Sequence, residues 1–127
     1  MPLVRIDVLE GRSSKQIAAL GDGVHRAMVE TINVPPSDRF QVITPHVPGW
    51  LIADPEYLGI QRSKDVVVIQ ITLNEGRTLE KKKALYAAIA RNLAADAGVR
   101  PEDVLVNLVE VVKDNWSFGN GIASYAT

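Results

Sequence analysis

The feature that most constrains this chain is an internal repeat, in which residue i resembles residue i+65 along two segments. Residues 10–13 read Glu-Gly-Arg-Ser, and residues 75–78 read Glu-Gly-Arg-Thr. Self-similarity at a fixed offset indicates two copies of one structural unit. The same frame, without a gap, places identical residues at Ala19 and Ala84, Leu20 and Leu85, Arg26 and Arg91, Val34 and Val99, Pro36 and Pro101, and Asp38 and Asp103.

We therefore place the two units at about residues 2–43 and 67–111. A connector at 44–65 joins them, and a tail at 112–127 follows the second unit. All of these segments belong to one domain that spans residues 1–127, since 127 residues is the size of a single ordinary domain.

Each unit reads as strand, turn, helix, turn, strand. Apolar and polar residues alternate over 3–9, which is typical of a strand, and 66–73 is a more continuously apolar mate. Ser13 and Thr78 stand at N-cap positions before amphipathic helical patterns. Gly98 predicts the end of the second helix.

Two such units predict a βαββαβ fold of the α+β class. Prolines end each helical segment, and the strands that follow are expected at about 39–44 and 104–111. Because each crossover makes its two strands parallel and right-handed, we expect a four-stranded mixed sheet with both helices on one face. The other face is expected to carry Leu105, Leu108 and Val109 together with apolar residues of 66–69, which favours oligomerisation through the sheet.

Composition excludes several classes of function. Lys and Arg number 14 and Asp and Glu number 15, so a generally basic nucleic-acid-binding protein is excluded. The chain has no cysteine, which excludes disulfide scaffolds, thiol catalysis and cysteine-ligated metal centres. Its apolar runs are far shorter than a membrane span. We expect a soluble cytoplasmic protein that uses no metal or cofactor and has no nucleic-acid or membrane partner.

Pro2 is the first candidate for chemistry. Removal of Met1, which is usual before a small residue, would leave Pro2 as an N-terminal secondary amine. A free α-amine titrates at roughly 7.7–8, and burial or a nearby cation lowers that value toward a general base active near neutrality. The alternative is a proline placed there for processing or to shape an edge strand.

Arg77 is the second candidate, at a turn between a strand and a helix, where its fork can bind a substrate carboxylate. Its repeat mate Arg12 occupies the equivalent turn, which favours a purely local role. However, the second unit has Val67 where the first has Pro2, so only one of the two equivalent sites can supply an amine.

Asp38 is the third candidate. Its repeat mate Asp103 indicates that the Pro-x-Asp sequence also has a structural role, such as an Asx turn. Trp116 and Phe118 in the tail are either packing residues or the walls of a small pocket. His25 is expected on the exposed surface of the first helix.

A set of short motifs runs along the whole chain: Met1-Pro2-Leu3, Asp38-Arg39-Phe40-Gln41, His46, Pro48-Gly49, Leu58-Gly59, Arg62-Ser63, Gly76-Arg77-Thr78 and Trp116-Ser117-Phe118-Gly119. Together these motifs resemble the tautomerase superfamily, whose members use an amino-terminal proline. The last motifs are similar to the malonate semialdehyde decarboxylase branch of that family.

This resemblance implies a homotrimer with the tautomerase (MIF-like) fold and a cofactor-independent enzyme that acts on a small oxo-carboxylate. It implies Pro2 as the catalytic amine, Arg77 as the carboxylate binder and Asp38 as a partner of the proline or the substrate. Trp116 and Phe118 would lie at the pocket.

Asn74 marks a departure from the family pattern, because some relatives have a second arginine in this region. A single arginine disfavours dehalogenation of a haloacrylate. Decarboxylation of a 3-oxo acid, which needs protonated Pro2, and keto–enol tautomerisation, which needs neutral Pro2, both stay open. Two other readings also stay open: a non-enzymatic small-molecule or protein-binding module on the same fold, and a ferredoxin-like regulatory module that binds a metabolite at its interface.

Overall fold

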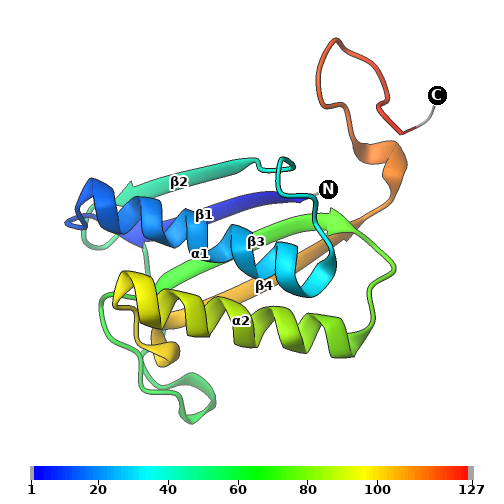
Figure 1. Ribbon diagram of the computed structural model, residues 1–127. Coiled ribbons are helices and arrows are strands. Elements are labelled where there is room, and N and C mark those ends of the chain that lie inside the picture. The colour runs from blue at the N-terminus through cyan, green and yellow to red at the C-terminus, as the bar shows by residue number, and fades with distance from the viewer. Residues whose placement is uncertain (1, 126–127) are drawn as a thin grey trace.

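The computed structural model describes residues 2–125, and its elements follow the order that the repeat predicts (Figure 1). The strands and helices are β1 (Leu3–Leu9), α1 (Ser14–Ile32), β2 (Gln41–His46), β3 (Val67–Asn74), α2 (Leu79–Ala97) and β4 (Val104–Val111). Three short 3₁₀ turns cover Tyr57–Gly59, Pro101–Asp103 and Lys113–Asn115. The predicted βαββαβ order is confirmed.

Both helices begin at the predicted caps. The Ser13 side chain accepts a hydrogen bond from the Gln16 amide, and the Gln16 side chain accepts one from the Ser13 amide, which completes a capping box. The Thr78 side chain caps α2 in the same position. Helix α2 ends at Gly98, as predicted, and α1 ends at Asn33; both residues have the left-handed conformation that releases a chain from a helix.

The sheet has the strand order β2-β1-β3-β4. Strands β1 and β2 are parallel, β3 and β4 are parallel, and the two pairs meet through an antiparallel contact between β1 and β3. In that contact Arg5 lies opposite Gln70, which is its own repeat mate. The pseudo-twofold axis that relates the two units therefore passes between these two residues.

Both helices cover the same face of the sheet, as predicted (Figure 1). Close approach of α1 to α2 depends on Gly23, since a Cβ atom there would lie 2.9 Å from Leu93 Cδ2. The Asn92 side chain donates a hydrogen bond of 3.0 Å to the Gly23 carbonyl across the same contact. The core beneath is formed by inward-facing strand residues that are at most 1% exposed: Val4, Ile6, Val8, Val67, Ile69, Ile71 and Leu73.

Strand β2 lies two residues further along the chain than predicted, and it enters the segment assigned to the connector. At its beginning, Arg39 is held in the preceding turn, where its amide donates to the Ser37 carbonyl at 3.1 Å. At its end, His46 stays in register with Leu9 of β1. His46 Nε2 also donates to Asp7 Oδ1 at 2.6 Å, which secures the last pairs of the ladder.

The opposite face of the sheet carries no helix. Val42, Leu105 and Val109 are 42%, 38% and 37% exposed in the single chain. Leu105 and Val109 therefore supply the expected apolar surface. The placement of Leu108 on this face was wrong, because side chains alternate along β4 and Leu108 packs against the core beneath the helices. No helix within residues 2–125 has the length and apolar character needed to cross a membrane.

Candidate functional site

One end of the sheet gathers the candidate residues. Pro2 directly precedes β1, is buried, and adjoins Leu3, which pairs with Thr72 near the end of β3. The turn before β2 reaches the same end, because the Val4 amide donates to the Phe40 carbonyl at 3.0 Å. Strands β3 and β4 both finish there, and the tail continues from β4 (Figure 1).

The tail folds back as a compact aromatic loop. The rings of Trp116 and Phe118 are stacked, with their centroids 5.1 Å apart and an angle of 8° between their planes. The Phe118 ring also contacts the Phe40 ring, at a centroid distance of 5.6 Å. The loop is closed by Ser124, whose amide donates to the Trp116 carbonyl at 3.2 Å and whose hydroxyl accepts from the Phe118 amide at 2.9 Å. Trp116, Phe118 and Phe40 thus form an aromatic cluster at this end of the sheet, in which Trp116 packs behind Phe118.

A pocket opens between this loop and the turn that precedes β2. It has a volume of about 430 Å³ and is lined by Pro35, Ser37, Asp38, Phe40, Phe118, Ser124 and Tyr125. Asp38 is only 5% exposed and belongs to the lining. The structure therefore brings Asp38 and Phe118 together, as the sequence analysis expected.

The turn that carries Asp38 is fixed from both sides. The Asp38 amide donates to the Pro35 carbonyl at 2.9 Å. His25 Nε2 donates to the Pro36 carbonyl at 2.8 Å, and His25 is 8% exposed, so the expectation of a surface histidine was wrong. The His25 side chain, on α1, is buried because it holds this turn in place.

Tyr125 is a residue of the pocket that the sequence analysis missed. Its ring meets Phe118 edge-on at 5.8 Å. Burial and the negative charge of Asp38 raise the pKa of its hydroxyl, and the Asn74 side chain partly offsets that rise. At neutral pH Tyr125 is therefore a neutral hydrogen-bond donor. The signal in the sequence was a third aromatic residue in the same glycine-rich tail.

Arg77 contacts the site through Asn74. Its Nη1 donates to the Asn74 carbonyl at 3.0 Å, and its Nη2 donates to the Ile32 carbonyl at the end of α1 at 3.4 Å. The Asn74 side-chain oxygen accepts from Trp116 Nε1 at 2.7 Å. Arg77 thus ties helix α1 to the residue that holds the tail, and its observed partners are main-chain carbonyls rather than pocket groups.

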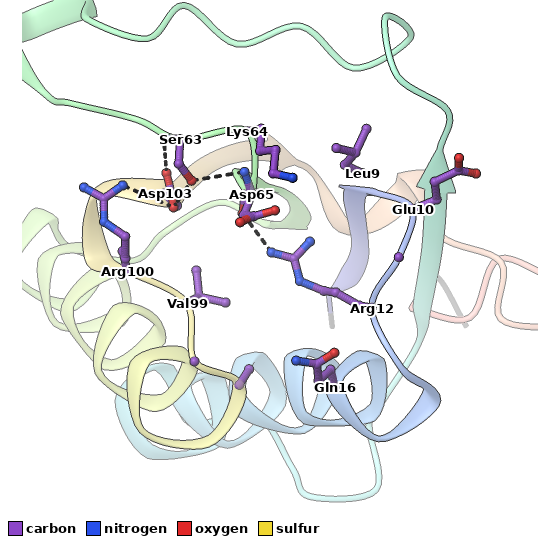
Figure 2. A pocket seen from close by; sticks show the side chains of 13 residues that line it. Leu9, Glu10, Arg12, Gln16, Ser63, Lys64, Asp65, Val99, Arg100 and Asp103 are labelled. Atoms are coloured by element: carbon purple, nitrogen blue, oxygen red, sulfur yellow. Dashed lines mark hydrogen bonds and ion pairs between the residues drawn. The ribbon is translucent and has the colours of Figure 1, made fainter.

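The other end of the sheet is the pseudo-equivalent site, and Figure 2 shows the polar contacts there. There Arg12 donates to the Asp65 carbonyl at 2.8 Å. Asp103, the mate of Asp38, accepts 2.7 Å and 2.6 Å bonds from the amide and hydroxyl of Ser63. The connector runs directly into Val67 at this end, so no amine is available.

At the Pro2 end of the sheet, the pocket presents the carboxylate of Asp38 and the phenol of Tyr125 between aromatic side chains. Met1, whose removal would free the Pro2 nitrogen, lies outside the described residues. Between residues 2 and 125, no group of three or more histidine or acidic side chains is arranged to hold a metal ion. The pocket therefore offers a carboxylate and a phenol, those of Asp38 and Tyr125, for acid–base chemistry.

Comparison with known proteins gives a consistent assignment. Two families, both described as tautomerase enzymes, match residues 38–119 and residues 2–61. The probable tautomerase YusQ of Bacillus subtilis (strain 168) is 42% identical over 97% of each chain, and the probable tautomerase YrdN of the same organism is 36% identical over 100% of this chain and 98% of its own.

Solved structures of similar proteins give the same family assignment. The FG41 malonate semialdehyde decarboxylase inhibited by 3-bromopropiolate is 44% identical, with a TM-score of 0.91 over 97% of this chain and 93% of its own. Another malonate semialdehyde decarboxylase, solved as wild type, mutant and inactivated enzyme, is 38% identical, with a TM-score of 0.90 over 96% of this chain and 94% of its own. A fused 4-OT described as a symmetric trimer, 23% identical with a TM-score of 0.78 over 94% of each chain, shares the fold.

The position of Tyr125 leads to a prediction. Its hydroxyl should ionise above the value of about 10 found for free tyrosine, and Asp38→Asn should lower that pKa by removing the negative charge. The measurement is an alkaline titration followed by phenolate absorbance. Subtracting the Tyr125→Phe titration removes the signals of Tyr57 and Tyr86. A Tyr125 pKa that rises or stays constant in Asp38→Asn would contradict the placement of these two groups.

Proposed function

The chain belongs to the tautomerase superfamily, on the malonate semialdehyde decarboxylase branch, and we propose that it decarboxylates a small 3-oxo acid without a cofactor, through Pro2. The observation that carries the proposal is the position of buried Pro2 at the same end of the sheet as the pocket that Asp38, Phe118 and Tyr125 line. Keto–enol tautomerisation of a 2-oxo acid is the other reaction that the same site supports.

The proposed reaction begins with Pro2 as a protonated amine that hydrogen-bonds to the 3-oxo group of the substrate. As the bond to the departing carboxylate carbon breaks, its electron pair forms the carbon–carbon double bond of an enol. The carbonyl oxygen accepts the proton of Pro2, CO₂ leaves, and the enol then converts to the aldehyde or ketone. This route requires the cationic form of Pro2, which a nearby anion stabilises.

Each other residue has a role that follows from its position. The charge of Asp38 favours the protonated amine. Tyr125, held neutral by its raised pKa, donates to a substrate oxygen. Phe118 and Phe40 exclude water from the reacting carbons, and Trp116 supports Phe118 by stacking. Low water content strengthens each of these polar contacts.

Decarboxylation is favoured over tautomerisation by the placement of the charges. An anion beside the amine raises its pKa, and a cation lowers it. Asp38 lines the pocket, whereas the Arg77 guanidinium is turned into the carbonyls of Asn74 and Ile32. We therefore place the Pro2 pKa at or above the roughly 7.7–8 of a free α-amine.

Pro2→Ala should abolish decarboxylation, because a primary amine on a different backbone does not reproduce the secondary amine or its fixed orientation. We would assay malonate semialdehyde decarboxylation and phenylenolpyruvate tautomerisation, together with intact-mass measurement of Met1 removal. Pro48→Ala, in the exposed connector, is the matched control and should retain full activity. Undiminished activity in Pro2→Ala, or in protein that quantitatively retains Met1, would exclude the amine mechanism. Wild-type protein inactive in both assays would instead favour the binding-module reading.

Arg77 and Arg12 form a second matched pair. We propose that Arg77 is a positioning residue that acts through Asn74, so Arg77→Ala should lower kcat/KM by about 10-fold or more, as expected when 1.5–3 kcal/mol of charged hydrogen bonding is lost. Arg12→Ala should stay within about twofold of wild type, as for a substitution remote from the site. The measurements are kcat, KM and the emission of Trp116 without ligand.

These readouts separate two roles of Arg77. Arg77→Lys keeps the positive charge but not the fork that reaches two carbonyls. A positioning role predicts a lower kcat and altered Trp116 emission in both Arg77 variants. A rise in KM alone, with Trp116 emission unchanged, would instead show that Arg77 binds the substrate carboxylate directly.

We also propose that the protein assembles as a homotrimer through the helix-free face of the sheet. The support is the apolar surface of Val42, Leu105 and Val109, together with the trimeric arrangement described for a fold neighbour. Sedimentation equilibrium at micromolar concentration should give three times the mass of the 13.9 kDa chain. Leu105→Lys should weaken the assembly, whereas Ala94→Lys on the exposed surface of α2 should not. A monomeric wild type would refute this assembly.

A further inference from the structure

A second cavity lies at the opposite end of the sheet from Pro2, where the repeat places the mate of the proposed active site. Its volume is about 370 Å³ (Figure 2). The turn between β1 and α1, the end of the connector, and the turn between α2 and β4 all line it. Arg12, Gln16, Lys64 and Val99 converge on this space from those separate segments.

The charges around this cavity are unevenly neutralised. The buried carboxylate of Asp103 accepts hydrogen bonds from the amide and hydroxyl of Ser63. It also lies 3.6 Å from Arg100, which forms a 2.9 Å ion pair with Glu102. Arg12, by contrast, forms no ion pair with any carboxylate of residues 2–125. Arg12 donates instead to the main-chain carbonyl of Asp65.

Lys64 also forms no ion pair within the described part of the chain. Glu10 lies at the rim, and its carboxylate points away from the cavity in Figure 2. The side chain of Asp65 is exposed, as that of Lys64 is, and also lines the cavity. Because acidic and basic side chains both border the cavity, the case for an anion there rests on the N–H groups that point into it rather than on net charge.

The donors that stay available match a carboxylate. Arg12 donates one of its two Nη2 hydrogens to the Asp65 carbonyl. The other Nη2 hydrogen and the N–H beside it on the free edge of the fork can still reach the two oxygens of a carboxylate. Gln16 uses its oxygen in the capping box, so its amide N–H groups are left for a ligand. Val99 and Leu9 supply apolar walls for a short carbon chain.

We propose that this cavity binds a small aliphatic carboxylate and does not transform it. Arg12 holds the carboxylate, Lys64 adds charge from the rim, and Val99 contacts the carbon chain. Reaction is excluded because Val67, at the position equivalent to Pro2, contributes a peptide nitrogen in place of an amine. The proposal does not depend on the activity of the Pro2 site, since it concerns different residues and requires only binding.

The test is an NMR titration of the full, isotopically labelled protein with sodium propionate, against sodium chloride at equal ionic strength. We expect propionate, and not chloride, to shift the Arg12 Nε–H signal and the amides of Lys64, Asp65, Gly98 and Val99. Arg12→Gln should weaken this binding by about 10-fold or more. Arg77→Gln, the same substitution at the other end of the sheet, should leave it unchanged.

Arg12→Lys controls for any loosening of the connector in Arg12→Gln. It keeps the charge but not the fork, so it should weaken binding by an intermediate factor while the unliganded spectrum stays close to wild type. Equal shifts with chloride, shifts confined to the residues around Asp38 and Phe118, or unchanged binding in Arg12→Gln would each overturn the proposal. A loss of decarboxylase activity with this titration intact would count against the proposed function alone.

Discussion

The antiparallel contact between β1 and β3 is the interaction on which the rest of the structure depends. Its inward side chains are almost completely buried beneath α1 and α2, and each such aliphatic side chain contributes about 1.5–3 kcal/mol when it leaves water. The contact also joins the two units about an axis between Arg5 and Gln70. Each strand and helix of one unit therefore has a counterpart in the other unit: β1 in β3, α1 in α2 and β2 in β4.

The two ends of the sheet became different because different chain segments reach them. At one end the chain begins, and the aromatic tail folds over Asp38. At the other end the connector enters, and Ser63 occupies Asp103. The same strand–turn–helix geometry therefore meets Pro2 and the aromatic tail at one end of the sheet and the connector at the other. Function in this fold follows from connectivity more than from the shared framework.

The repeat, the helix caps and the glycine turns were enough to predict the fold, because each is specified by residues close together in sequence. Gly11 and Gly76, at φ values of +119° and +118°, even adopt the same backbone conformation in the two copies. The bounds of β2 were less predictable, because they depend on pairing with β1 and on the distant contact of His46 with Asp7. Local pattern does not contain that information.

The site was predictable in part. Asp38 and Phe118 were expected at the pocket, and the structure places both there. Tyr125 was missed because nothing near it in sequence shows that the tail turns back onto Phe118. The contacts of Arg77 with Asn74 and Ile32 were missed for a related reason: a fork that suits a carboxylate suits two main-chain carbonyls equally well, and only the arrangement of α1 against β3 decides between them.

The hydrogen bond between Trp116 and Asn74 makes the fluorescence of Trp116 sensitive to changes at the site. Trp116 is partly buried, stacked on a pocket residue and hydrogen-bonded to the amide that Arg77 positions. The other tryptophan, Trp50, is 81% exposed in the connector, at a distance along the chain from these contacts. A soluble quencher would suppress the fluorescence of exposed Trp50 first and leave that of Trp116. The remaining fluorescence would then report ligand binding in the pocket of the unlabelled protein.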